Sequence, residues 1–357
     1  MAIHPAGEVG PYPAEVRHRI RRDVHADYPY VAQALNDCGV NVVSLQYGHD
    51  IWGGEDGIFL LDFIRALRVP MVATLHDVPA NPSPAVRSIL AELVDTAAAT
   101  IVMSNSAAGA MARSYGIAGD RLQVVPHGVP HLPQVAADTI KPRLGLQGRS
   151  VVLSFGLLEP GKGCETIIDA MPAVAAAVPN ALYVILGATD PNLVTRDGEI
   201  YRISLEARAA ALGVAQNVKF VDRFVGSVEQ GNWLEAADVI ATPYPDLDRS
   251  VAATLSYAMA AGKPIVSTPY AYALEMLAAD RGRLVTHVTP EAFADVIVEL
   301  LNDPELRAAM GRRAYEHSRG MVWWEVGAQY RRIFDQAISR PSSLPDRSSR
   351  KLATVIA

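Results

Sequence analysis

Cysteine and clustered positive charge are both scarce in this sequence. The 357 residues include only two cysteines, Cys38 and Cys164, which lie far apart without the spacing of metal ligands. We therefore expect no disulfide and a reducing, cytoplasmic compartment. The formal net charge is −6 and no long run of lysine and arginine occurs, which argues against nucleic acid as the main partner. The short basic stretch at residues 17–22 is predicted to be the solvated face of a helix.

Segments that would cross a membrane are also missing from the sequence. No apolar run reaches the roughly 20 residues that span a bilayer. The first residues include Pro5, Gly7, Pro11 and Pro13 and lack the apolar core of a signal peptide. We expect a soluble protein with no transmembrane segment. Peripheral membrane contact and homo- or hetero-oligomers stay open.

What the sequence does contain is a long alternation of apolar, β-branched runs with helical patterns. Half of the residues are apolar, and the chain exceeds the length that one hydrophobic core usually serves. Continuous apolar strands that alternate with helices predict parallel sheets covered on both faces. In the first half we expect strands at residues 40–46, 70–75, 100–103 and 122–125, and helices at residues 15–36, 56–68, 84–97 and 106–115.

The alternation lapses over residues 131–150 and then starts again. This lapse predicts a first domain over residues 1–135, a second over residues 136–339 and a flexible tail over residues 340–357. In the second half we expect strands at residues 151–155, 182–186, 218–220, 238–241 and 264–267, and helices at residues 165–177, 199–212, 228–235, 251–260, 290–302, 304–319 and 322–339.

One turn in the second half has the features of an anion site. A buried strand at residues 151–155 is followed by Gly156, the turn Pro160-Gly161-Lys162-Gly163 and a helix from Glu165. In this arrangement the helix N-terminus points unpaired N–H groups toward the carboxyl end of the strand. Lysine adds a positive charge, so a diphosphate is the expected guest. The spacing matches neither the dinucleotide fingerprint nor a Walker loop, and a surface turn with a solvated lysine is the alternative.

Several stretches resemble the family 4 retaining glycosyltransferases of the GT-B fold. The second half carries GLLEPGKGCETIIDAMP, LGATDPN, FVDRFV, DVIATPY and AMAAGKPIVSTPYAYALEML, and the first half carries VVSLQYGHDIWGGEDG, PMVATLHDV, IVMSNSAAGAM and VVPHGV. The resemblance covers roughly residues 12–334. It implies an α/β protein of two doubly wound, Rossmann-like domains facing across a cleft, followed by C-terminal helices. The first domain would bind the acceptor and the second the nucleotide sugar.

The resemblance also implies a reaction. A hexose would pass from a nucleotide diphosphate sugar to a hydroxyl of a glycan, lipid or small-molecule acceptor, with its anomeric configuration retained. Neither a cofactor nor a metal is implied. The implied catalytic residues are His76, Lys162 and Arg223; the donor-binding residues are Gly53, Gly54, Gly156, Val225, Thr254 and Tyr257; and the acceptor-side residues are His127 and Gln46.

The roles of these residues differ in kind. Lys162 would hold the diphosphate, where charge builds up as the phosphate leaves, and Arg223 would lie near the same phosphates. His76, at the end of a buried strand, would form a hydrogen bond to the sugar rather than transfer a proton. For Gly53 and Gly54 a simple strand-to-helix turn is an equal alternative, and for His127 a structural role is equally open.

The sequence also departs from the family pattern. Two glutamates usual in the family are replaced by Arg249 and Tyr257, a Ser-Gly pair by Ala252-Ala253, an arginine by Leu157 and a histidine by Asp190. The family's opening strand, glycine loop, helix and second strand are not predicted before residue 15. These departures keep a second class of function open, a non-catalytic GT-B protein that binds a nucleotide, a glycan or a partner glycosyltransferase.

Two further alternatives rank lower. A nucleotide-sugar epimerase or phosphorylase could have the same fold, although no motif for a pyridoxal lysine is present. The pair Asp246 and Asp248 resembles a metal-binding carboxylate pair, but hard divalent ions require more oxygen ligands than two aspartates supply.

Overall fold

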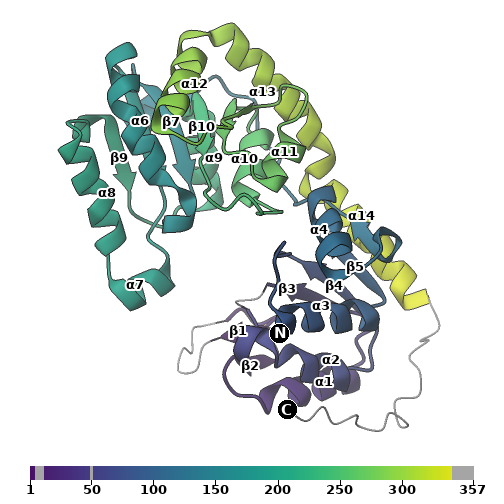
Figure 1. Cartoon of the computed structure of the whole chain (residues 1–357). Coiled ribbons are helices and arrows are strands. Elements are labelled where there is room, and N and C mark those ends of the chain that lie inside the picture. Colours follow the sequence, from purple (N-terminus) through teal and green to yellow (C-terminus); the bar gives the residue numbers. More distant parts are fainter. Residues whose placement is uncertain (5–11, 49–50, 340–357) are drawn as a thin grey trace. The chain divides into compact units, whose positions relative to one another are not determined.

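The structure, a computed structural model, describes residues 1–4, 12–48 and 51–339 (Figure 1). It divides into two compact units, of which unit 1 comprises Met1–Val125 with Gly327–Ala357, and unit 2 comprises Pro126–Val326. The expected boundary at residue 135 therefore lies inside unit 2. The described residues from Gly327 to Ser339 group with unit 1, whereas the sequence placed them in the second domain. The expected tail, residues 340–357, lies outside the described residues.

Unit 1 contains a four-stranded parallel sheet in the order β3-β4-β5-β6 and a separate parallel pair, β1-β2. The predicted strands and helices after residue 40 are confirmed, with small shifts at their ends. The elements are β1 (Ala2–His4), β2 (Arg19–Arg21), α1 (Asp27–Asp37), β3 (Val43–Tyr47), α2 (Leu60–Ala66), β4 (Met71–Leu75), α3 (Pro84–Thr96), β5 (Ala99–Val102), α4 (Asn105–Tyr115), β6 (Leu122–Val124) and most of α14 (Trp323–Ser339).

The helix expected over residues 15–36 is wrong in its first half, because β2 lies there. Ile20 pairs with Ile3 of β1 and is buried, whereas its neighbours Arg19 and Arg21 are exposed, which is the alternation of a strand. Helix α1 begins at Asp27, whose carboxylate accepts hydrogen bonds from the Arg21 backbone at 3.0 Å and from its guanidinium at 2.7 and 2.8 Å. Two strands thus precede α1 where no strand was predicted.

Helix α14 completes unit 1 from the far end of the sequence. The hydroxyl of Tyr330 lies 3.1 Å from the hydroxyl of Thr74, a buried residue of β4. This hydrogen bond joins residues 256 positions apart. Sequence distance therefore hid the fact that the C-terminal helix belongs with the first sheet.

Unit 2 contains a six-stranded parallel sheet in the order β12-β11-β10-β7-β8-β9. Its predicted strands and the longer helices are confirmed, and the short elements α5, α7, α11 and β12 were not predicted. The elements are α5 (Ala137–Ile140), β7 (Ser150–Phe155), α6 (Cys164–Ala177), β8 (Ala181–Leu186), α7 (Pro191–Asp197), α8 (Ile200–Ala211), β9 (Val218–Val221), α9 (Ser227–Ala236), β10 (Val239–Thr242), α10 (Ala253–Ala260), β11 (Ile265–Ser267), α11 (Ala271–Met276), β12 (Arg283–Leu284), α12 (Pro290–Asn302) and α13 (Pro304–Ser318).

Both faces of the unit 2 sheet are covered, as a doubly wound fold requires. Val151, Leu153 and Phe155 of β7 point into a core shared with α9, α10 and α11. Val152, between them, points into the opposite core, which α6, α8 and α12 cover. Helices α6 and α12 pack side by side over that face (Figure 1). The near-continuous apolar sequence of β7 follows from this burial on both sides.

The strand order of unit 2 reverses between β7 and β10. The chain runs from β7 outward through β8 to β9, and then returns to the other side of β7 to form β10, β11 and β12. In open parallel sheets, ligands bind outside the carboxyl ends of the strands at such a reversal. This topology marks the ends of β7 and β10 as the place to search for a site.

Within the described part of the chain, no helix combines the length and the apolar character needed to span a bilayer.

Candidate functional site

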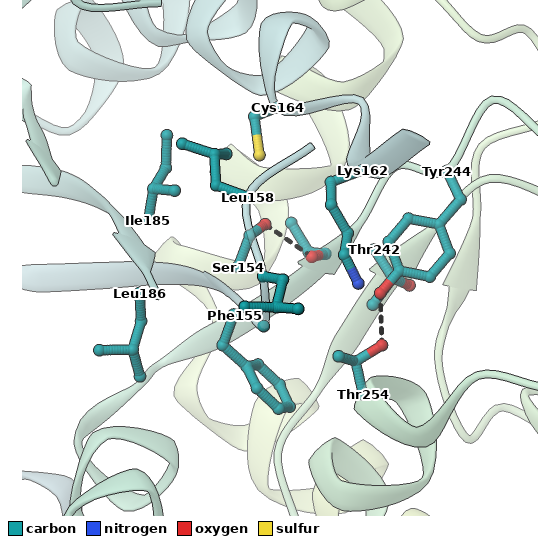
Figure 2. A pocket seen from close by; sticks show the side chains of 13 residues that line it. Ser154, Phe155, Leu158, Lys162, Cys164, Ile185, Leu186, Thr242, Tyr244 and Thr254 are labelled. Atoms are coloured by element: carbon teal, nitrogen blue, oxygen red, sulfur yellow. Dashed lines mark hydrogen bonds between the residues drawn. The ribbon is translucent and has the colours of Figure 1, made fainter. Parts of the chain in front are cut away.

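A pocket lies at the reversal point of the unit 2 sheet (Figure 2). Its walls come from the end of β7 and the loop after it, from β8, from the end of β10, and from the first turns of α6 and α10. The lining residues are Ser154, Phe155, Gly156, Leu157, Leu158, Lys162, Cys164, Ile185, Leu186, Ala241, Thr242, Tyr244 and Thr254. Three of the predicted site residues, Gly156, Lys162 and Thr254, are therefore brought together.

Lys162 ends the short 3-10 turn Pro160–Lys162, which leads from β7 into α6. Its Nζ atom lies 5.2 Å from the centroid of the Tyr244 ring, and Figure 2 shows the ammonium beside the hydrogen-bonded pair Tyr244 and Thr254. Among the described residues Lys162 forms no ion pair with a carboxylate. An ammonium that has no counterion in the protein can bind an anionic ligand without first breaking an internal ion pair.

Gly156 keeps open the space in front of this ammonium. Its φ of 109° lies in the range that side chains rarely adopt, and a Cβ atom here would lie 3.3 Å from Lys162 Nζ and 3.5 Å from Thr254 Cγ2. The Gly156 amide donates to the Leu186 carbonyl at 3.0 Å, so it extends the sheet rather than facing a ligand. Glycine is thus needed for backbone shape and space.

Two helices begin at the pocket without a capping side chain. Helix α6 starts after Gly163 and helix α10 starts after Ala252, and neither N-cap residue supplies a side-chain hydrogen bond to the first turn. In contrast, Asp190 caps α7 by accepting from two backbone N–H groups. Uncapped N-termini keep free N–H donors and the positive end of the helix dipole for a ligand. Both features favour an anion at this place.

The back of the pocket is formed by buried, neutral groups. The Tyr183 hydroxyl donates to Ser154 Oγ at 3.0 Å, and Ser154 in turn donates to the Ala241 carbonyl at 2.8 Å. Burial raises the pKa of Cys164 to about 12. This thiol therefore stays protonated at neutral pH and is a packing group, not a nucleophile.

Arg223 lies outside the lining of this pocket. Its guanidinium forms a two-pronged pair with the Glu229 carboxylate at the start of α9, and the side chain is half exposed. The Trp233 indole N–H donates to the same carboxylate at 3.2 Å. Val225 is packed against the core, whereas the neighbouring Phe224 is exposed. The expected phosphate role of Arg223 would require this arginine to leave Glu229.

His127 and Tyr257 lie together in unit 2, although the sequence assigned them to opposite sides of the site. Their ring centroids are 6.0 Å apart with the planes at 68°, and His127 also packs against Trp323 at 6.0 Å. Burial lowers the pKa of His127 and raises the pKa of Tyr257. Both side chains are therefore neutral at pH 7, as expected for a packed pair.

Unit 1 brings together two other predicted residues, Gln46 and His76. They end the neighbouring strands β3 and β4, and His76 Nε2 lies 2.6 Å from Gln46 Oε1. The Gln46 amide also donates to Ser44 Oγ at 3.0 Å, and the His76 backbone N–H donates to the Tyr47 carbonyl at 2.8 Å. Because a carbonyl oxygen only accepts, the imidazole Nε2 carries a hydrogen, and His76 is held in one orientation.

Gly53 has a structural role within unit 1. Its amide donates to the Tyr28 hydroxyl at 2.8 Å, and a Cβ atom here would lie 1.7 Å from the Arg22 carbonyl oxygen. Gly54 has a φ of 79° at the start of a short 3-10 turn. The Gly53 amide is thus occupied inside the unit, which corrects the expectation that it faces the donor. The alternative of a strand-to-helix turn describes these two glycines.

The aspartate pair that resembles a metal-binding motif, an interpretation ranked low from the sequence, lies in a turn. Asp246 accepts a hydrogen bond from the Asp248 backbone at 3.1 Å, and both residues are exposed. Residues 1–4, 12–48 and 51–339 contain no group of three or more histidine, cysteine, aspartate and glutamate side chains able to hold a metal ion.

Sequence reasoning did not assign Tyr244 and Arg249 to the site. Tyr244 lines the pocket and bonds Thr254 through its hydroxyl. Arg249 places its guanidinium carbon 5.0 Å from the centroid of the same Tyr244 ring. The sequence contained one indication of this role, because Arg249 stands where the family 4 glycosyltransferases usually have a glutamate.

Two family models match this chain, one in each half. The family model described as glycosyl transferases group 1 matches residues 137–317, and the one described as glycosyltransferase family 4 matches residues 4–131. The first match includes every residue that lines the pocket. The second includes Gln46 and His76.

Similar proteins of known name are also glycosyltransferases. D-inositol 3-phosphate glycosyltransferase from Corynebacterium glutamicum (strain R) is 28% identical over 316 residues, which cover 83% of this chain and 72% of that protein. The protein of the same name from Xylanimonas cellulosilytica is 31% identical over 293 residues, which cover 76% of this chain and 67% of that protein. These relatives are enzymes, which decides against the non-catalytic class of function.

Solved structures share the fold at low sequence identity. Sucrose-phosphate synthase from Thermosynechococcus elongatus matches with a TM-score of 0.75 at 18% identity, covering 94% of this chain and 87% of that one. Anabaena HepE, solved in complex with UDP, matches with a TM-score of 0.70 at 19% identity, covering 87% and 82%. The two parallel sheets, the family matches and these neighbours lead to the same conclusion. The chain has the GT-B fold and belongs to the glycosyl transferases group 1 family.

Proposed function

We propose that this glycosyltransferase transfers a hexose from a nucleotide diphosphate sugar to a hydroxyl acceptor, with retention of configuration and without a metal. The observation that carries the proposal is the position of Lys162. Its ammonium has no carboxylate partner among the described residues and lies in a pocket where α6 and α10 begin uncapped. Such a pocket matches a diphosphate in charge and in hydrogen-bond donors.

The same groups would act in the reaction. The bond between the sugar C1 and the diphosphate oxygen breaks, and the acceptor oxygen bonds to C1. The acceptor's proton passes to the departing diphosphate oxygen, and the nucleoside diphosphate leaves. Charge on the leaving phosphate grows during this step, so a fixed cation stabilises the transition state more than the ground state. At an effective dielectric constant of about 20, one charge about 4 Å from another contributes about 4 kcal/mol.

The relatives suggest which molecules to test first. Relatives are named as acting on D-inositol 3-phosphate and as GDP-mannose-dependent, and HepE is described in complex with UDP and UDP-glucose. We therefore propose UDP- and GDP-linked hexoses as donors and inositol 3-phosphate as the first acceptor. His76 of unit 1 would form a hydrogen bond to the transferred sugar, and Gln46 would lie on the acceptor side.

Calorimetric titration with UDP, GDP and ADP, followed by transfer assays with the matching sugars, tests the proposal. Lys162→Ala should abolish transfer while the melting temperature stays unchanged, because the ammonium forms no ion pair among the described residues. Lys219→Ala is the matched control, since it removes a lysine of the same unit that lies 5.9 Å from the Trp233 ring centroid. Turnover by Lys162→Ala equal to that of the control would refute the mechanism.

A further inference from the structure

Arg249 is a second cation close to the Tyr244 ring that Lys162 contacts. Arg249 lies in the loop between β10 and α10, and its guanidinium carbon is 5.0 Å from the centroid of the Tyr244 ring. The Lys162 Nζ atom is 5.2 Å from the same centroid. Each contact is within the range of a cation–π interaction. Two positive charges near one ring repel each other unless an anion lies close by.

No described carboxylate neutralises these two charges. In the part of the chain that the structure describes, neither Lys162 nor Arg249 forms an ion pair, and Arg249 Nε is buried without a hydrogen-bond partner. Asp246 and Asp248 are close in sequence but exposed, and Asp246 turns back to the Asp248 backbone. The contrast is Arg223, whose guanidinium is paired with Glu229. An arginine that served only the fold would be expected to bond a carboxylate, as Arg223 does, or backbone carbonyls, as Arg281 does.

The loop holds Arg249 in place for a ligand. The Arg249 carbonyl accepts from the Tyr272 backbone N–H at 3.0 Å, and the Leu247 carbonyl accepts from the Ala271 backbone N–H at 2.8 Å. These two hydrogen bonds attach the loop backbone to the start of α11 at both residues that flank Asp248. The Tyr244 ring is itself stacked on buried Tyr270, with centroids 5.3 Å apart and planes at 30°. Because the loop backbone and the Tyr244 ring are already held in place, ligand binding costs little conformational entropy there.

We propose that Arg249 is a donor-binding residue that works with Lys162 to hold an anionic group of the donor. This inference rests on the proposed function and extends it, because it predicts a donor with more negative charge near the sugar than Lys162 alone would neutralise. The ligand chemistry is a set of anionic oxygens. Their source is either the diphosphate, which every donor of this class carries, or a carboxylate on the transferred sugar.

The experiment compares Arg249→Ala and Arg249→Lys with Arg312→Ala, a control that removes an exposed arginine of α13. Each protein is titrated with the nucleoside diphosphate that the wild type binds, with its glucose conjugate and with its glucuronic acid conjugate, in low and high salt. We expect Arg249→Ala to weaken binding at least tenfold, Arg249→Lys to restore part of it, and Arg312→Ala to change nothing. The loss should shrink as salt is added.

The three ligands separate the two sources of negative charge. Equal losses for all three place the diphosphate at Arg249, and a loss confined to the glucuronic acid conjugate places a sugar carboxylate there. Arg249→Met, which keeps an apolar contact with the ring, repeats the test if Arg249→Ala fails to fold.

Two different outcomes would contradict the proposals. The first contradicts only the role of Arg249, and the second also contradicts the proposed function. If Arg249 variants bind all three ligands like Arg312→Ala while Lys162→Ala binds weakly, Arg249 is not a donor ligand and the proposed function stands. If neither Arg249 nor Lys162 affects binding, or if the wild type binds no nucleoside diphosphate, the proposed function fails as well.

Discussion

His76 Nε2 lies 2.6 Å from Gln46 Oε1, so one residue of unit 1 holds the ring of another in a single orientation. The two residues are 30 positions apart, and their strands β3 and β4 pair directly. Gln46 is therefore a positioning residue for His76, and its removal should affect activity more than stability.

Gln46→Leu should lower kcat by about tenfold, because a hydrogen bond of about 1–1.5 kcal/mol that orients His76 is lost. The melting temperature should hardly change, because Gln46 is exposed. Gln33→Leu, another exposed glutamine of unit 1, is the control. Equal kcat values for the two variants would remove the positioning role.

Gly53→Ala should destabilise unit 1 by roughly 2–4 kcal/mol, because the new methyl group would overlap the Arg22 carbonyl oxygen. Gly119→Ala is the control, since no atom lies within 4 Å of its Cβ position. Urea unfolding measures both. A stable Gly53→Ala variant with weakened donor binding would restore the donor-contact interpretation that the structure opposes.

Gly156→Val should weaken nucleoside diphosphate binding by at least tenfold. Its side chain would fill the space in front of the Lys162 ammonium, and the φ of 109° adds about 1–3 kcal/mol of strain. Titration calorimetry and unfolding separate the two effects. In Gly226→Val, with no atom within 4 Å of the Cβ position, affinity should stay at the wild-type value. Unchanged affinity in Gly156→Val would show that the pocket binds no phosphate.

Lys263 should make stability depend on pH. Burial lowers its pKa from 10.5 to about 8, so between these values the unfolded chain binds more protons than the folded one. Stability from this group therefore rises with pH through that window and is lowest below pH 8. From pH 7 to 9.5 the free energy of unfolding should rise by about 2 kcal/mol more in the wild type than in Lys263→Met.

Subtracting the change measured in Lys263→Met from the change measured in the wild type cancels the titration of the other groups, including the buried tyrosines. Lys219→Met should show the wild-type slope, because Lys219 lies at a partly exposed position on β9. If Lys263→Met and the wild type have parallel stability curves between pH 7 and 9.5, Lys263 is not the source of the effect.

Transfer should proceed unchanged in excess EDTA, because Lys162 and two helix N-termini supply the positive charge that a metal would otherwise bring to a diphosphate. Asp246→Asn should likewise leave kcat and KM within twofold of the wild type, since this carboxylate accepts from the Asp248 backbone. Loss of activity in EDTA that Mg²⁺ or Mn²⁺ restores would contradict metal-independent transfer.

Local patterns predicted most of the strands and helices, and they failed where a long-range partner decided the outcome. Ile20 could belong to an amphipathic helix or to a strand, and only pairing with Ile3 makes it part of β2. Helix α14 was predicted over nearly its full length, but its place in unit 1 depends on Tyr330 meeting Thr74. The spacing of apolar residues shows which face of a segment is buried, but it does not show which other segment packs against that face.

The amino-acid sequence by itself determined the two parallel sheets, the glycine-bearing turn around Lys162 and the family, because apolar periodicity, turn residues and local motifs are all short-range properties. The tertiary structure alone decided how those pieces are used. In the folded chain the Gly53 amide donates to Tyr28, and Arg223 forms an ion pair with Glu229. Lys162 and Arg249 both lie close to the Tyr244 ring. Contacts of that kind depend on the distance between side chains in space, which the order of residues along a chain does not contain.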